Sequence, residues 1–233
     1  MKRVWRSAQV AEHADGFAIT LDGKAVRTPG KRNLVVPTRA LAEAIASEWN
    51  AQGDTVEPSE MPLTRYANSA SDGVMLRRAE VIEEVTRFGA TDLICYRATE
   101  PPELVERQLE NWQPLADWIA DELEIKLEIA SGVIPVAQSE STMNGFRAAV
   151  SAFGDFSLTG LHGATAACGS LVIGLALARG HLDAEAAWML SQIDETFQIE
   201  RWGEDAEATD RRARLRADIE ATSRFMVLGG AAR

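Results

Sequence analysis

The stretch LHGATAACGSLVIGLALAR, from Leu161 to Arg179, is the longest weakly polar run in the chain. No charged residue occurs between residues 164 and 178. A helix needs roughly 18 or more apolar residues to span a bilayer, whereas this run is shorter and contains Thr165 and Ser170. It therefore predicts a buried core helix, which is apolar on every face because protein surrounds it.

Small residues recur every four positions along this predicted helix. Ser170, Gly174 and Ala178 would form one ridge on its surface. Glycine costs a helix interior about 1 kcal/mol relative to alanine, so Gly174 indicates a second helix packed closely against that ridge. We therefore expect the C-terminal half of the chain to be a helical domain built around residues 161–179.

The composition is that of an ordinary globular protein, with 46% hydrophobic residues, 25% charged residues and a net charge of −11. The negative charge argues against general binding to nucleic acids or to anionic membranes, because both favour basic patches. It is compatible with a partner that has a basic surface, although a solvated acidic exterior explains it equally well.

The cysteines and the N-terminus point to a reducing compartment. Cys95 and Cys168 are far apart and form no CxxC motif, so we expect buried, reduced thiols and neither a disulfide framework nor a zinc site. Residues 1–16 contain no apolar segment of the kind found in secretory signals. The sequence therefore predicts a cytoplasmic protein without stable membrane insertion, and we favour a monomer.

The N-terminal region has the pattern of a small antiparallel sheet. Residues 17–21 alternate large apolar residues with smaller or polar ones, and Asp22-Gly23 is a strong hairpin signal. Residues 24–28 would form the return strand, and residues 33–36 another short strand. Thr38 then predicts the N-cap of a helix, and Trp49 is most simply a core residue of that helix.

Most of the remaining chain has helical periodicity. We expect helices over about 65–88, from 102 onward, over 143–153, from 184 to 203 with Asp183 as N-cap, and over about 205–225. Residues 123–129 alternate with period two and predict a strand. The expected fold is α+β with two domains, a small β-rich domain (residues 1–60) and a larger, mainly helical domain (residues 61–233).

No catalytic or metal-binding motif stands out. His13, His162 and His181 are not at metal-ligand spacings, and the glycine motifs of phosphate loops, dinucleotide folds and nucleophile elbows are missing. We expect neither a cofactor nor a metal. The densest acidic set could do acid–base chemistry, but on an acidic protein it is more often a solvated face; its members are Asp194, Glu195, Glu204, Asp205 and Glu207. Asp194 follows a mostly apolar helical segment, so it could lie at a rim and meet a partner.

Seven motifs in a fixed order resemble one known family. They are DGKAVRTPGK (22–31), VPTRALAEAIASEWNAQ (36–52), EMPLTR (60–65), TDLICYRA (91–98), QLENWQPLADW (108–118), GSLVIGLALA (169–178) and IDETFQIERWGEDAEA (193–208). Each is weak alone, but together they are specific and cover nearly the whole chain. The sequence resembles the ATP synthase assembly chaperones that bind the α subunit of the F1 sector.

The resemblance implies a function and a set of site residues. Members of this family bind the free α subunit and shield its interface until the β subunit replaces the chaperone. The family's functional acid corresponds to Asp194 or Glu195, and the two alternatives stay open. The complete predicted partner-binding set is Asp194, Glu195, Gln198, Trp202 and Trp49.

Two hypotheses follow for the acidic segment near Asp194. In the first, the protein is an α-subunit chaperone without catalytic turnover. In the second, it is a small-molecule enzyme that uses the acidic cluster. A deep polar pocket containing Asp194, Glu195 and a histidine would favour the enzyme, whereas a shallow apolar surface bordered by acids would favour the chaperone.

Overall fold

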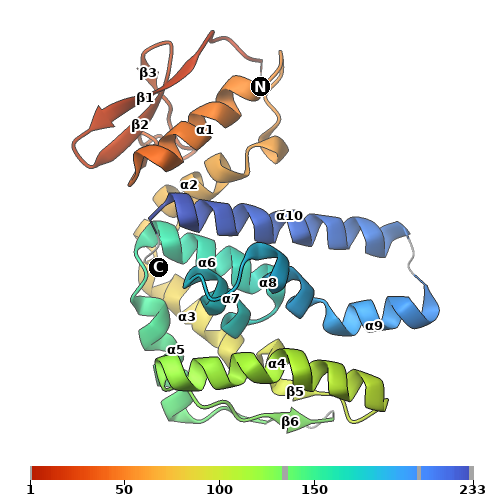
Figure 1. Cartoon of the computed structure of the whole chain (residues 1–233). Coiled ribbons are helices and arrows are strands. Elements are labelled where there is room, and N and C mark those ends of the chain that lie inside the picture. Colours follow the sequence, from red (N-terminus) through yellow and green to blue (C-terminus); the bar gives the residue numbers. More distant parts are fainter. Residues whose placement is uncertain (1, 133–135, 204–205, 231–233) are drawn as a thin grey trace.

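The computed structural model describes residues 2–132, 136–203 and 206–230, and combines a small N-terminal antiparallel sheet with a mainly helical remainder (Figure 1). This arrangement confirms the predicted fold class. The strands are β1 (Ala8–His13), β2 (Gly16–Leu21), β3 (Lys24–Ala25), β4 (Val35–Val36), β5 (Tyr96–Arg97) and β6 (Ala130–Ser131). The α-helices are α1 (Arg39–Ala51), α2 (Pro62–Asp72), α3 (Arg78–Phe88), α4 (Pro102–Leu123), α5 (Glu140–Ser151), α6 (Asp155–Cys168), α7 (Leu171–Ala178), α8 (Ala184–Ser191), α9 (Ile193–Trp202) and α10 (Ala206–Leu228).

The N-terminal sheet is built on strand β2, which pairs antiparallel with β1, β3 and β4. The predicted turn joins β2 to β3. Asp22 and Gly23 have φ angles of 47° and 81°, the left-handed conformation that two-residue hairpin turns require. The regular return strand is shorter than predicted, since it comprises Lys24 and Ala25; Val26 adds one further backbone bond, to the Ile19 carbonyl of β2.

Helix α1 covers one face of this sheet. Its N-cap is the predicted Thr38, whose side chain accepts a hydrogen bond from the Leu41 backbone N–H. Trp49 is only 9% exposed and meets Trp5 edge-on, with 5.1 Å between ring centroids. The prediction that Trp49 is a core residue is confirmed.

The stretch that was predicted to form one buried helix forms two. Gly169 adopts a left-handed conformation, with φ 66°, and ends α6; Ser170 then caps α7 by accepting the Ile173 backbone N–H. The predicted burial is confirmed, since all eight residues of α7 are buried. The prediction of one continuous helix was wrong. Glycine readily takes the left-handed conformation that ends a helix, and serine is more favourable as an N-cap than inside a helix.

Gly174 lies where the two helices touch. A Cβ atom at this position would lie 2.5 Å from Thr165 Oγ1 of α6, which is closer than real contacts allow. The expected close packing is therefore present, and the neighbouring helix is the one that immediately precedes α7 in the chain. Helix α10 also packs along α6, where Gly160 and Gly163 face Met226 and Thr222.

Asp92 anchors the start of α7 from a distant part of the chain. Its side chain is completely buried. Asp92 Oδ1 accepts hydrogen bonds from Ser170 Oγ (2.6 Å) and the Ile94 N–H (3.2 Å), and Oδ2 accepts the Val172 N–H (3.0 Å). Burial raises the pKa of Asp92 to about 6, although these hydrogen bonds act in the opposite direction.

Two further expectations about regular structure were wrong. Residues 65–88 are not one helix, because Gly73 and a 3₁₀ turn at Val74–Leu76 separate α2 from α3. The strand predicted over residues 123–129 does not form: Leu123 ends α4, and residues 124–129 have no regular structure. Ile125 is buried in the helical core, while side chains take the place of a pairing strand: Gln138 bonds both backbone groups of Glu128, and Thr142 donates to the Lys126 carbonyl.

The buried apolar residues form two clusters. One joins the N-terminal sheet to α1 and α2 and also includes Phe156 and Phe225. The other fills the space between the helices from Val74 onward. The domain boundary at residue 60 stays a prediction. Within the described parts of the chain, no helix is long and apolar enough to cross a membrane.

The substitution Gly174→Leu should destabilise the fold, because the new side chain would collide with Thr165. We expect a loss of about 1–3 kcal/mol in the free energy of unfolding, measured by urea denaturation. Gly53→Leu is the matched control, since open space surrounds Gly53. Equal stability of the two variants would contradict the close contact between α6 and α7.

Asp92 should make stability depend on pH. Because its folded pKa of about 6 lies above the ordinary value of 3.8, its contribution is fully present below pH 3.8 and is lost as the pH rises through 6. The difference in unfolding free energy between the wild type and Asp92→Asn should therefore shrink by roughly 3 kcal/mol from pH 4 to pH 7. A difference that stays constant over this range would show that burial does not raise this pKa.

Candidate partner-binding site

Helix α9 carries most of the residues that the sequence singled out. The sequence predicted one helix from residue 184 to 203; Asp183 caps its start and Gly203 ends it, as expected. However, Gln192 leaves the helical conformation, with φ −115° and ψ 16°, and separates α8 from α9. The break lets α9 turn away from α8, so that it lies between α4 and α10 (Figure 1).

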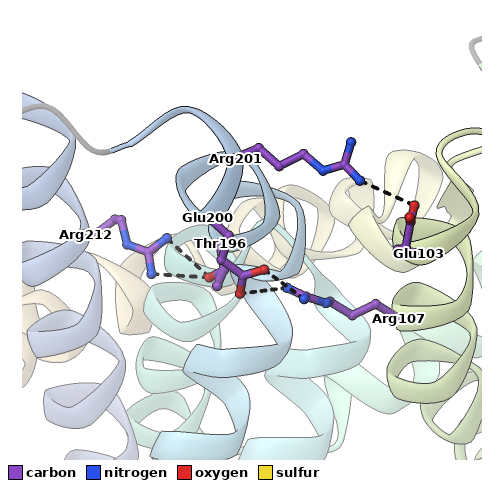
Figure 2. Close-up of polar contacts among 6 residues, drawn as sticks. All are labelled: Glu103, Arg107, Thr196, Glu200, Arg201 and Arg212. Carbon is purple, nitrogen blue, oxygen red and sulfur yellow. Dashed lines mark hydrogen bonds and ion pairs between the residues drawn. The ribbon is translucent and has the colours of Figure 1, made fainter.

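Few apolar contacts hold α9 in place. Only Ile193 and Phe197 of this helix are buried. Polar side chains on both sides complete its attachment, and Figure 2 shows some of the contacts of α9 with α4 and with α10. The helix is therefore held by exposed polar contacts more than by burial of apolar surface.

On the α4 side, two ion pairs hold the last turns of α9. Arg107 donates to both carboxylate oxygens of Glu200, at 3.0 and 2.8 Å, and Arg201 reaches Glu103 at 3.3 Å (Figure 2). The hydrogen bond between Arg107 and Glu200 raises the pKa of Arg107 and lowers the pKa of Glu200. The guanidinium groups of Arg107 and Arg201 also lie over the Phe197 ring.

On the α10 side, arginines reach back to the first turn of α9. Arg211 pairs with Glu195 at 2.8 Å, and Arg212 donates to Thr196 Oγ1 at 3.3 Å. The alternation of arginines and acids along α10 predicts pairs between residues four apart in the same helix. Arg216 forms such a pair with Glu220, whereas Arg211 joins two helices.

Asp194 is held by a buried amide. Gln108 of α4 is only 2% exposed. Its Oε1 accepts the Ala98 backbone N–H at 2.7 Å, which fixes the amide orientation, and its Nε2 donates to Asp194 Oδ1 at 2.6 Å. Within the described residues, Asp194 Oδ2 has no hydrogen-bond partner. The half-buried carboxylate thus keeps one oxygen available to another molecule.

Three of the predicted site residues lie along one line of α9. Asp194, Gln198 and Trp202 are spaced by four residues and therefore share one face of the helix. Asp194 is half-buried, Gln198 is exposed and Trp202 is 76% exposed. We call these three residues the α9 stripe. Glu195 lies beside the stripe in its ion pair with Arg211, and Trp49 is buried in the N-terminal cluster, away from α9.

Hollows lie on both sides of α9. One of about 560 Å³ has an apolar floor that includes Trp188, Met189 and Ile193, with Arg107 and Arg212 at its edges. The other, of about 600 Å³, is lined by Glu195, Glu207 and arginines of α10. Neither hollow is lined by a described histidine or cysteine.

The structure describes only part of the acidic set around Asp194. Glu204 and Asp205 lie outside the described residues. Over the described parts of the chain, no group of three acidic, histidine or cysteine side chains is arranged to hold a metal ion. His162 lies 3.9 Å from Glu84, and His181 stacks on Trp118, so neither is near Asp194 in a catalytic arrangement.

Comparison with known proteins identifies the family of this chain. The model of the ATP12 chaperone protein family matches residues 2–120. The chain belongs to the ATP12 chaperone family. This membership confirms the resemblance to the F1 assembly chaperones that the sequence motifs indicated.

Several relatives match this chain over nine-tenths or more of its length. The crystal structure of Atp12 from Paracoccus denitrificans is 45% identical, with a TM-score of 0.94 and 98% coverage of both chains. An aspartate-to-lysine mutant of the same protein gives a TM-score of 0.94 at 44% identity, covering 98% of this chain and 97% of the mutant chain. The mitochondrial protein atp12 of Schizosaccharomyces pombe is 27% identical over 223 residues, which are 90% of this chain and 77% of that protein.

The residue that positions Asp194 was missed in the sequence. Gln108 occurs where the apolar pattern of α4 calls for a buried residue, between Leu104 and Trp112 at a spacing of four. A polar residue at such a position needs a buried partner. This signal was present, but the sequence could not say that the partner would come from residue 194.

The ion pairs of α9 should control its local opening. Arg107→Gln should lower global stability by at most about 1 kcal/mol, because both partners are partly exposed, yet amide hydrogen exchange in α9 should become faster. Arg147→Gln is the control, since Arg147 makes a similar two-bond pair with Glu83 elsewhere. If both variants exchange equally fast in α9, the Arg107–Glu200 pair does not hold this helix.

Proposed function

We propose that this protein binds the free α subunit of the F1 sector of ATP synthase and shields its assembly interface until the β subunit takes its place. Membership of the ATP12 chaperone family and the motifs of the sequence support this proposal. We place the partner contact on the α9 stripe. The observation that supports this placement is Asp194 Oδ2, which no described residue bonds.

The structure offers a physical reason to prefer Asp194 over Glu195. Glu195 already pairs with Arg211, so a partner would have to displace that guanidinium. Asp194 is oriented by the buried Gln108, and no residue in the described part of the chain bonds its second oxygen. A carboxylate held in this way can accept a charge-assisted hydrogen bond from a cationic or N–H group of the α subunit at little cost in side-chain entropy.

Trp202 supplies the apolar part of the contact. Its ring is 76% exposed at the end of α9, and exposed tryptophans are frequent anchors of protein interfaces. An unassembled subunit exposes apolar surface that would otherwise be buried between subunits. Covering that surface with one ring and one carboxylate gives specificity with moderate affinity, which lets the β subunit replace the chaperone.

The alternative of a small-molecule enzyme receives less support. The hollows beside α9 are open and combine apolar or arginine-rich walls with ion-paired acids, and Asp194 meets an amide instead of a histidine or a second carboxylate. The family to which the chain belongs is described as one of chaperone proteins. A cytoplasmic location and a monomeric state stay predictions.

The decisive experiment is co-purification with the α subunit from the same organism, first alone and then with the β subunit added. We expect a complex of the two proteins that β dissolves. Asp194→Lys should weaken this complex at least tenfold. It should lower the melting temperature by only a few degrees, because the side chain is partly exposed and the fold loses one hydrogen bond, from Gln108 Nε2. Isothermal titration calorimetry would give the affinities.

Two matched variants make the test specific. Glu195→Lys introduces the same change one residue along and should weaken binding less, since it mainly disrupts the pair with Arg211. Trp49→Phe, in the buried N-terminal cluster, should leave the affinity unchanged. Normal binding by both charge-reversal variants would remove α9 from the interface, and absence of any complex with folded α would refute the proposed function.

A further inference from the structure

The first turn of α6 has no internal cap. Gly154 occupies the N-cap position and has no side chain to accept a hydrogen bond. The first bond of this turn runs from the Leu158 N–H to the Gly154 carbonyl. Within the described residues, the N–H groups of Asp155, Phe156 and Ser157 have no partner. Three backbone donors at the positive end of a 14-residue helix are therefore unused.

Ser157 adds a fourth unused donor at the same place. The residue is only 9% exposed, and its hydroxyl group has no hydrogen-bond partner within the described chain. The oxygen itself is not sealed off from solvent, so it can bond to a molecule in the hollow. Ser157 lines the same hollow as the first turn of α6, so a ligand in that hollow could satisfy it.

The hollow has a volume of about 490 Å³ and lies far from α9 in the sequence and in the fold (Figure 1). Phe153, Phe156 and Pro37 give it apolar walls. Gly229 and Gly230 close one side, because α10 returns along α6 and brings its last turn beside the first turn of α6.

The charges around the hollow favour an anion. Asp155 is the acid in the first turn of α6, but Arg78 pairs with it at 2.7 Å and also donates to the Phe153 carbonyl, so its charge is balanced. Arg179 lines the hollow, and its guanidinium lies 6.0 Å from the centre of the Phe153 ring. Among the described residues it has no carboxylate partner, which leaves a net positive charge.

We propose that this hollow binds a small organic anion. Its phosphate or carboxylate group accepts hydrogen bonds from the first turn of α6 and from Ser157 and pairs with Arg179, while its apolar part rests on Phe153 and Pro37. The proposal is independent of the proposed function, since none of these residues belongs to α9.

The test uses the full-length protein and three probes at constant ionic strength: phenyl phosphate, benzoate and inorganic phosphate. Binding is followed by the ¹⁵N–¹H amide signals of Asp155, Phe156 and Ser157. Phenyl phosphate or benzoate should shift these signals with saturation and bind at least fivefold more tightly than inorganic phosphate, because of the apolar walls. The tighter of the two aromatic probes identifies the anionic group.

Two variants make the assignment specific. Gly154→Asp places a carboxylate at the N-cap, where open space surrounds the glycine and its φ of −69° suits other residues. This variant should fold normally and bind the better probe at least tenfold more weakly, since its own carboxylate occupies the donors. Arg179→Gln should weaken binding at least fivefold.

Arg87→Gln is the control, because this arginine is exposed on α3 and is not among the residues that line the hollow; its affinity should equal that of the wild type. Shifts that do not saturate, or equal binding by Gly154→Asp and the wild type, would overturn the proposal.

Discussion

The buried, hydrogen-bonded side chain of Asp92 is the constraint on which the helical part of the protein depends. It joins the segment before β5 to the start of α7, two regions that are far apart in the sequence. A buried carboxylate is stable only where donors surround it. Three donors do so here, and they fix both the break between α6 and α7 and the position of α7 in the centre of the core. The other helices then pack around a segment whose direction is already set.

The sequence predicted the elements of the fold better than their ends. Local signals identified the Asp22-Gly23 hairpin and the Thr38 and Asp183 caps, because these depend on residues that are neighbours in the chain. The breaks at Gly73, Gly169 and Gln192 were missed. At these positions periodicity alone permits a continuous helix. At Gly169 the left-handed glycine and the Ser170 cap end it, and the bond from Ser170 to the distant Asp92 fixes the break. The strand predicted over residues 123–129 is missing because Leu123 still belongs to α4 and the side chains of Gln138 and Thr142 bond the backbone that follows.

The candidate site shows a similar division. The family resemblance predicted a functional acid at one of two neighbouring positions, and the i, i+4, i+8 spacing of the α9 stripe was present in the sequence. What separates Asp194 from Glu195 is the identity of their partners. Gln108 comes from α4 and Arg211 from α10, and no local pattern indicates which acid each would meet. Likewise, the burial of Trp49 followed from its position on α1, but its pairing with Trp5 did not.

The contrast between α7 and α9 suggests how stability and binding are combined in one chain. Helix α7 is buried on all sides and tied to Asp92, whereas α9 buries two residues and relies on partly exposed ion pairs. Exposed ion pairs contribute little to global stability, so α9 can adjust locally without loosening the core. Under the proposed function α9 holds a subunit and later releases it. This arrangement suits that task, since the contacts of α9 can be exchanged one at a time while the scaffold stays folded.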